Sequence, residues 1–323
     1  MKFSLVMPAY KSEKTIAESI DTVIAQAYKN WELIIVNDGS QDSTLEIIRD
    51  YVKRDERIRV FSQENAGTAT ANNFGIAQAV GDYITIFPSD DWLLPNYLEE
   101  FKRIIELSPG YDIYFANGKV KYEDGRELKI IEENLFNVEP TFIQIVNLCP
   151  CSLGAMVKKG VHAGVGWYRK EFYTEDYDFW LRAADKGKKI YFYDEELVKV
   201  RISKTQKSAN KTAIYTSDLA IMKELLKNQK RSKEEVIALE DRIYRLKLLR
   251  EGKSDKLKMQ DKLKSETGQQ LEESSQKFSS LIEKRFGSQN APKVLNAFHK
   301  ITFIIRPLRV AFYRLKVACK KER

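Results

Sequence analysis

The first 117 residues alternate between short apolar runs and segments in which apolar residues recur with the period of a helix. Strands at 3–7, 31–37, 58–62, 82–87 and 111–117 and helices at 12–26, 43–54 and 68–80 are predicted from this pattern. Strands that alternate with helices of this length form a parallel sheet covered by helices on both faces. The predicted fold class is therefore α/β, with a mainly parallel, Rossmann-like sheet.

The pattern changes in the second half of the chain. The sequence EDGR at 123–126 predicts a turn, and residues 175–187 predict a helix that opens with acidic residues. From about residue 212, Gly and Pro become rare and apolar residues recur at heptad spacing: Val236, Leu239, Ile243 and Leu246. This spacing favours a helical hairpin or a short coiled coil, and the alternative is one amphipathic helix packed on the main domain. We expect a domain at 1–210, a helical extension at 211–285 that could form a homo-oligomer through 230–285, and a C-terminal helix at 286–323.

Carboxylates follow two of the predicted strands. Asp38 ends the second strand, and Asp90 and Asp91 follow the fourth. The carboxyl ends of parallel strands meet at one edge of a sheet, where ligands bind. Adjacent carboxylates repel each other, which favours a divalent cation carrying a phosphorylated ligand at this point. The alternative is that Ser89 or Asp90 caps a helix beginning near Trp92.

The charge is unevenly distributed. Residues 1–210 hold 27 Lys and Arg against 32 Asp and Glu, whereas residues 211–323 hold 27 against 14. The last 33 residues carry nine basic side chains and one acidic, beside an apolar helical face. This argues against a nucleic-acid-binding main domain and favours a C-terminal helix lying on an anionic membrane surface. A helix docked on the protein's own body is the alternative.

Cysteine and histidine content excludes several site types. Three cysteines suit a reducing compartment, and the pair Cys149 and Cys151 lacks the second pair of a zinc site. The two histidines, His162 and His299, are too isolated for a His-based metal site or a Ser-His triad. MKFSLVMP reads as a first strand and not as a signal peptide, and no stretch reaches the roughly 18 uncharged apolar residues of a spanning helix. We expect a cytoplasmic protein held peripherally at the inner face of the plasma membrane.

Four segments, in this order, resemble the family 2 glycosyltransferases with the GT-A fold. They are VMPAYKSEKTI, ELIIVNDGSQDST, QENAGTATANNFGIAQAVGDYITIFPSDDWLLP and TEDYDFWLRAADKG. The resemblance runs from Lys2 to about Ser208 and implies an inverting enzyme that moves one sugar from a nucleotide-diphosphate donor, typically a UDP-sugar, to a hydroxyl. The acceptor expected with the basic tail is a lipid-linked or growing surface glycan, and the product is β-linked.

The same resemblance implies roles for individual residues. Those implied to line the nucleotide-base pocket are Pro8, Ala9 and Tyr10, with Glu13 close by. Asp38 would accept a hydrogen bond from the base, Asp90 would reach the ribose, and Asp91 would bind Mg²⁺ or Mn²⁺ on the diphosphate. Asp176 would be the catalytic base, with Glu175 beside it. These roles agree with the chemistry, since a hard cation stabilises the leaving diphosphate and a carboxylate can take the proton of the acceptor hydroxyl.

The chain departs from the family pattern at four positions: Lys11, Asn72, Pro88 and Ser203. Ser203 stands where relatives often carry a His that helps to hold the metal. The basic residues Arg201, Lys204 and Lys207 could cover the diphosphate instead, or form a solvated linker. The departures also leave an alternative function, a catalytically degenerate protein that serves as a partner for another glycosyltransferase. A sugar nucleotidyltransferase is disfavoured because PAYKSEKT lacks a Gly-rich loop.

Overall fold

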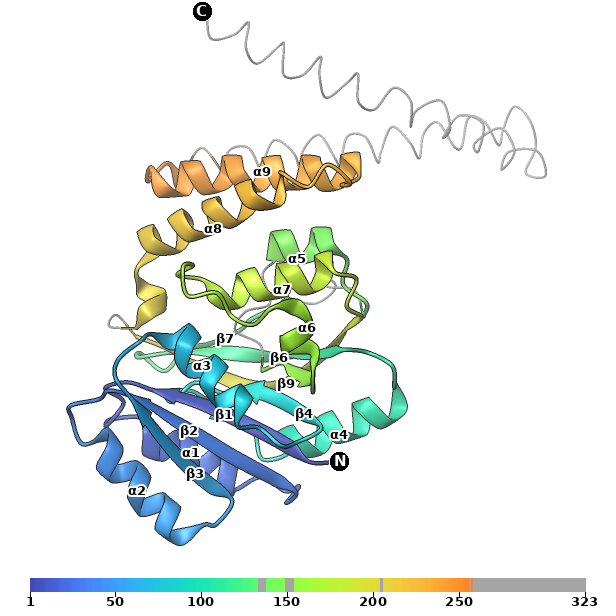
Figure 1. Cartoon of the computed structure of the whole chain (residues 1–323). Coiled ribbons are helices and arrows are strands. Elements are labelled where there is room, and N and C mark those ends of the chain that lie inside the picture. The colour runs from blue at the N-terminus through green and yellow to red at the C-terminus, as the bar shows by residue number, and fades with distance from the viewer. Residues whose placement is uncertain (133–137, 149–153, 204–205, 256, 258–323) are drawn as a thin grey trace, which may run out of the picture. The chain divides into compact units, whose positions relative to one another are not determined.

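The N-terminal part of the sheet is parallel, as predicted. In the computed structural model, β1 (Phe3–Ala9) lies between β2 (Trp31–Asp38) and β4 (Tyr83–Ile86), with β3 (Ile58–Gln63) beside β2 (Figure 1). Every residue of β2 is buried, which explains its almost uninterrupted apolar run. The carboxyl ends of these four strands therefore share one edge of the sheet.

The remaining strands make the sheet a mixed one. In the described residues it has nine strands, and the order is β3-β2-β1-β4-β8-β6-β9-β5, with β7 paired to β6. β8 runs antiparallel to β4 and β6, and β5 runs antiparallel to β9. The hairpin between β6 and β7 turns at the predicted residues 123–126. The strands of this half are β5 (Trp92–Leu93), β6 (Ile113–Tyr122), β7 (Glu127–Lys129), β8 (Met156–Lys158) and β9 (Ile190–Ile202).

Helices cover both faces of the sheet, again as predicted (Figure 1). One face carries α1 (Ile16–Ile24), α2 (Thr44–Arg54) and α4 (Tyr97–Leu107) over a core that includes Leu5 and Met7. The other face carries a second core around Val6 and Phe115, and its helices are α3 (Thr68–Ala77), α5 (Phe142–Leu148), α6 (Val161–Val165) and α7 (Glu175–Asp185). Alternate residues of β1 thus enter different cores, as the period of a strand requires.

Two further helices extend the second core. A 3₁₀ turn, η1 (Lys207–Ala209), leads into α8 (Lys211–Leu225), and α9 (Lys233–Arg250) follows. α9 packs against α8 and α5 and buries Leu239 and Leu246, two of the residues at heptad spacing. Ser232 and Glu235 form a capping box that fixes where α9 begins. The compact unit that contains these helices spans Met1–Gly252.

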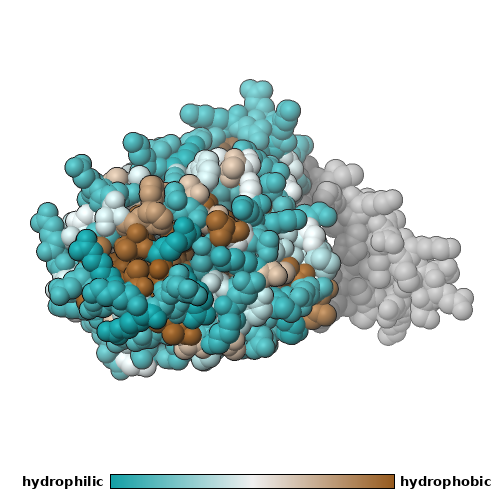
Figure 2. Space-filling view, turned by 60° about the horizontal axis from the view of Figure 1, so that its bottom comes forward, coloured by the Kyte–Doolittle hydropathy of each residue, from teal (hydrophilic) through white to brown (hydrophobic). Residues whose placement is uncertain are grey.

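The structure describes residues 1–132, 138–148, 154–203, 206–255 and 257. Cys149, Cys151, the predicted helix 286–323 and most of 253–285 lie outside the described residues, so the domain limits and the homo-oligomer stay predictions. None of the helices in the described part combines the length and apolar character needed to cross a membrane. The face shown in Figure 2 is mainly hydrophilic, with a hydrophobic patch toward its left side and smaller ones elsewhere, as expected when most apolar side chains fill the two cores.

Two helix starts differ from the expectation. The first helix begins at Ile16 and not at Ser12, whose carbonyl instead accepts the N–H groups of Thr15 and Ile16. No helix begins near Trp92, because Trp92 and Leu93 pair with Lys199 and Val198 as β5 and the helix starts only at Tyr97. The N-cap interpretation of Ser89 and Asp90 is therefore wrong.

Candidate active site

Loops from the ends of β1, β2 and β4 are joined to one another. The hydroxyls of Ser12 and Ser89 share a hydrogen bond of 2.7 Å, which links the loop after β1 to the loop after β4. The Lys11 N–H donates to Ser40 Oγ at 3.1 Å, which links the same loop to the one after β2. Lys11 has a φ of 51°, so this non-glycine residue makes a left-handed bend there. The three loops form one rim, as the strand pattern predicts.

Residues expected around a nucleotide base lie in and after the end of β1. Pro8 has no backbone N–H to donate. No hydrogen bond to β4 is lost through this, because β4 pairs only with residues 3–6 of β1. Ala9 is buried, whereas Tyr10 is 46% exposed, with Lys11 Nζ 5.2 Å from the centroid of its ring. Glu13 is exposed and accepts the N–H of Ser43 at 3.1 Å. Of this group, Tyr10 offers the flat surface on which a base can stack.

Asp38 is tied to the loop before α3. Its Oδ1 accepts from Gln63 Nε2 at 2.7 Å and from the Ala66 N–H at 2.8 Å, and its Oδ2 accepts from the Gly67 N–H at 2.9 Å. Gly39 follows with a φ of 72°, and a Cβ at this position would come within 2.8 Å of the Asn65 nitrogen. Asp38 is 4% exposed, and its buried carboxylate holds this loop in place. Its three hydrogen bonds leave part of its capacity to accept hydrogen bonds for a ligand.

Asp90 and Asp91 are both held by the end of β9. The Asp91 Oδ1 accepts the Arg201 N–H at 2.9 Å, and the Asp90 carbonyl accepts from Arg201 Nε at 3.0 Å. The Arg201 guanidinium lies 4.0 Å from the centroid of the Trp92 ring. On the Asp90 side chain, Oδ2 accepts from Gln206 Nε2 at 2.7 Å. Arg201 therefore binds both members of the acidic pair and lies beside the rim.

The surroundings of Asp91 suit a divalent cation. Burial and the charge of Asp90 raise the pKa of the Asp91 carboxyl well above its usual value, a penalty that a bound cation would remove. The described residues hold no group of three or more His, Cys, Asp or Glu side chains placed to bind a metal. Mg²⁺ and Mn²⁺ sites on nucleotides use one or two carboxylates with phosphate oxygens, so Asp91 fits as the protein ligand of such a site.

The second acidic pair opens α7. Glu175 is buried, and its Oε2 lies 2.5 Å from Lys207 Nζ. Asp176 is partly exposed and accepts the Tyr177 N–H at 2.8 Å. Burial and the neighbouring charge of Glu175 raise the pKa of Asp176 to about 7. A carboxylate with this pKa can accept a proton near neutral pH.

Consecutive residues connect the two acidic pairs. Gln206 donates to Asp90 on the rim, and Lys207 pairs with Glu175 on α7. Gln206 Nε2 also donates to the Arg201 carbonyl at 2.7 Å, and its Oε1 accepts the Ser203 N–H at 2.8 Å. No pattern in the sequence indicated Gln206, and the two alternatives for Lys207 did not include a pair with Glu175. These contacts bring both acidic pairs into one site.

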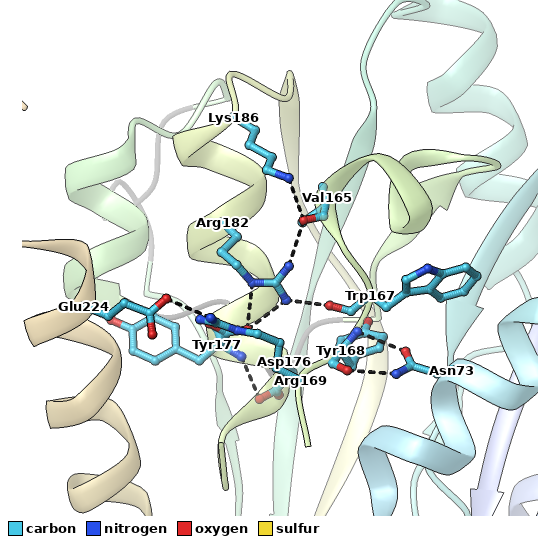
Figure 3. A network of polar contacts seen from close by, with 11 residues as sticks. Asn73, Val165, Trp167, Tyr168, Arg169, Asp176, Tyr177, Arg182, Lys186 and Glu224 are labelled. Carbon is cyan, nitrogen blue, oxygen red and sulfur yellow. Dashed lines mark hydrogen bonds and ion pairs between the residues drawn. The ribbon is translucent and has the colours of Figure 1, made fainter. Parts of the chain in front are cut away.

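A buried ion-pair network fixes α7 to the loop that precedes it (Figure 3). Asp178 is fully buried and is paired with Arg169 and Arg182, the latter at 2.8 Å. Arg182 also donates to the carbonyls of Val165 and Trp167, which has a φ of 56° and a ring that extends away from the network (Figure 3). The i, i+4 spacing of Asp178 and Arg182 could have indicated this pair from the sequence.

An amide-to-backbone pair ties the same loop to α3. Asn73 Nδ2 donates to the Tyr168 carbonyl at 2.8 Å, and its Oδ1 accepts the Tyr168 N–H at 3.0 Å (Figure 3). The neighbouring Asn72, one of the departures from the family pattern, is buried, and its Oδ1 has no partner among the described residues. Pro88, another departure, is exposed.

Comparisons with known proteins show which protein family this chain is similar to. Residues 4–161 match the family model described as Glycosyl transferase family 2. EpsE of Bacillus subtilis strain 168, which also carries a glycosyltransferase name, is 31% identical over 227 residues, 68% of this chain and 80% of EpsE. Glycosyltransferase GlyA of Streptococcus pneumoniae serotype 4 is 33% identical over 153 residues, 43% of this chain. This chain spans only 22% of GlyA, so that relative's whole activity does not transfer to it.

Solved structures share the fold. TarS residues 1–349 of S. aureus, in complex with UDP-GlcNAc, has a TM-score of 0.63 at 21% identity and covers 77% of this chain and 73% of its own. The mannosyltransferase PcManGT of Pyrobaculum calidifontis, in complex with GDP-Man and Mn²⁺, has a TM-score of 0.59 at 15% identity, over 75% of this chain and 69% of its own. These likenesses confirm the predicted fold class.

Proposed function

The chain belongs to glycosyl transferase family 2, and we propose that it moves one sugar from a UDP-sugar to a hydroxyl of a lipid-linked or growing surface glycan. The observation that carries the proposal is the joining of two acidic pairs by the consecutive residues Gln206 and Lys207. One pair suits a nucleotide diphosphate with its cation, and the other suits proton removal from an acceptor. A sugar transfer needs both beside each other.

Donor binding uses the rim. Tyr10 stacks on the base, and Asp38 accepts a base N–H with the capacity its loop contacts leave unused. Asp90 accepts a ribose hydroxyl at Oδ1, while its Oδ2 keeps the Gln206 amide. Mg²⁺ or Mn²⁺ on Asp91 would supply the positive charge that stabilises the leaving diphosphate. The UDP-GlcNAc complex of a protein with the same fold supports this choice of donor class.

Asp176 acts as the base. Its raised pKa makes it a strong enough acceptor for the proton of an attacking hydroxyl and leaves a large ionised fraction above pH 7. Glu175 lies beside it and is paired with Lys207. One base and no protein nucleophile give a single displacement, which inverts the anomeric centre. An α-linked UDP-sugar then yields a β-glycosidic bond.

The proposed location is the cytoplasm, peripherally at the inner face of the plasma membrane. Its support is the sequence of the tail, with nine basic and one acidic side chain in 33 residues beside an apolar stripe. We expect the full chain to sediment with vesicles containing anionic lipid, and a chain ending at residue 285 to remain in solution. Equal sedimentation of the two chains would remove this part of the proposal.

Turnover of UDP-sugars tests the reaction. With Mn²⁺ present, we expect the protein to hydrolyse one UDP-sugar of a panel slowly and Asp176→Asn to lose about 10²-fold or more of that rate, since proton transfer contributes this much. Calorimetry with UDP should show that Asp176→Asn still binds the nucleotide. A wild-type protein that neither binds nor hydrolyses any UDP-sugar would favour the catalytically degenerate partner protein instead.

A further inference from the structure

Lys207 reaches from the segment after β9 to the first turn of α7. Its Nζ lies 2.5 Å from Glu175 Oε2, whereas the Asp176 carboxylate accepts the Tyr177 N–H. We propose that Lys207 is a positioning residue that holds Glu175 as the ionised member of the pair and so leaves Asp176 as the single base. The inference rests on the proposed function and assigns the roles within its acidic pair.

The lysine is itself held in place from both sides. Tyr173 Oη donates to the Lys207 carbonyl at 2.7 Å, and Lys207 Nζ lies 5.0 Å from the centroid of the Tyr173 ring. The preceding residue, Gln206, is fixed on Asp90. The Lys207 side chain is 42% exposed, and these contacts hold its ammonium group on Glu175 while leaving it open to solvent.

Glu175 needs this partner because it is buried. A carboxylate that is 5% exposed is costly to ionise unless a positive charge or several donors face it. Without Lys207, Glu175 and Asp176 would compete for one proton, and neither would be the defined base. With Lys207 in place, the negative charge stays on Glu175, and that charge makes Asp176 more basic.

Other charged groups around α7 are paired elsewhere. Asp178 is neutralised by Arg169 and Arg182, and Glu224 of α8 also pairs with Arg169. Asp218 of α8 accepts the Thr174 hydroxyl and lies 3.8 Å from Arg242 of α9. The remaining groups against α7 are His162 of α6, which is buried and neutral, and Arg231, which pairs with Asp185. Among the described residues, Lys207 is thus the cation whose charge acts directly on Glu175 and Asp176.

A titration in the absence of substrate tests the assignment. The side-chain carboxyl of Asp176 would be followed by ¹³C NMR in the full chain, assigned with Asp176→Asn, in the wild type, Lys207→Met and Lys207→Arg. We expect the Asp176 carboxyl to titrate in one step in the wild type and in Lys207→Arg, and in two steps shared with Glu175 in Lys207→Met, because the pair then competes for one proton. Lys211→Met, which removes an exposed positive charge four residues further on, should leave the titration unchanged.

The rate profile gives the matching kinetic result. For hydrolysis of the UDP-sugar that the panel identifies, with Mn²⁺, the acid limb of kcat/KM should broaden in Lys207→Met and recover in Lys207→Arg. An Asp176 titration that stays a single step in Lys207→Met would overturn the inference. So would a loss of about tenfold in UDP–Mn²⁺ affinity with no change in the titration, which would make Lys207 a diphosphate ligand. If the titration changes as expected while the wild type turns over no UDP-sugar, the proposed function fails and the charge assignment stands.

Discussion

At the scale of single residues, His162 shows how burial decides what a titratable side chain does. It is 2% exposed, stacks on Phe179 at 5.0 Å between ring centroids, and has no partner for either ring nitrogen among the described residues. Burial lowers the pKa of His162 to about 3. The residue is therefore an aromatic part of the core, in line with the exclusion of a His-based site from the sequence.

This predicts acid sensitivity that one substitution removes. The folded pKa lies below the unfolded value of 6.5, so the stability is fully present above pH 6.5 and falls as the pH drops towards 3. Between pH 7.5 and pH 5 the loss should be about 2 kcal/mol in the free energy of unfolding. His162→Phe keeps the stacked ring but has no group that takes up a proton. Between the two pH values, its free energy of unfolding should therefore fall by about 2 kcal/mol less than that of the wild type. Urea unfolding of both proteins at the two pH values checks it, and parallel pH dependences would contradict it.

At the scale of elements, the helix α7 carries the candidate base, and its position depends on a buried ion pair. Asp178 has no exposed surface, while Arg169 and Arg182 keep 25% and 14% of their side chains exposed. Removing the carboxylate leaves two neighbouring guanidinium groups with only Glu224, paired with Arg169, to offset their charge among their described partners. Such a buried pair is costly to break even where its net contribution is small.

We therefore expect Asp178→Asn to lower the free energy of unfolding by about 3–5 kcal/mol. The matched control is Asp50→Asn on α2, whose pair with Lys53 is exposed and should contribute little to stability. Chemical denaturation of the three proteins gives the comparison. Equal losses in the two variants would mean that the network does not hold α7.

The elements that the sequence predicted are those with enough residues to show a period. The apolar run of β2 and the periodic α2 were found because seven or more positions repeat one pattern. β5 and β8 were missed because they have two and three residues, and a strand this short is defined by its partners. β5 exists because Trp92 and Leu93 meet β9 more than 100 positions later in the chain.

At the scale of the whole molecule, the sheet edge brings together what the chain separates. The carboxylates of the rim were predictable because they follow strands whose carboxyl ends must meet, and the family motifs assigned them roles. The contacts of Gln206 with Asp90 and of Asn73 with Tyr168 were not predictable, since they join positions 116 and 95 residues apart with no repeating pattern. The topology of the sheet therefore sets where the site residues lie, and tertiary contacts join them into one site.

Metal-dependent nucleotide binding tests the central claim most directly. Calorimetry of UDP with and without Mn²⁺ would be run on the wild type, Asp91→Ala and the control Asp50→Asn. Asp91 is the buried carboxylate that fits the cation, so Mn²⁺ should tighten UDP binding by tenfold or more in the wild type and the control and have no effect in Asp91→Ala. Binding that Mn²⁺ tightens equally in all three proteins, or no binding of UDP to the wild type, would contradict the account.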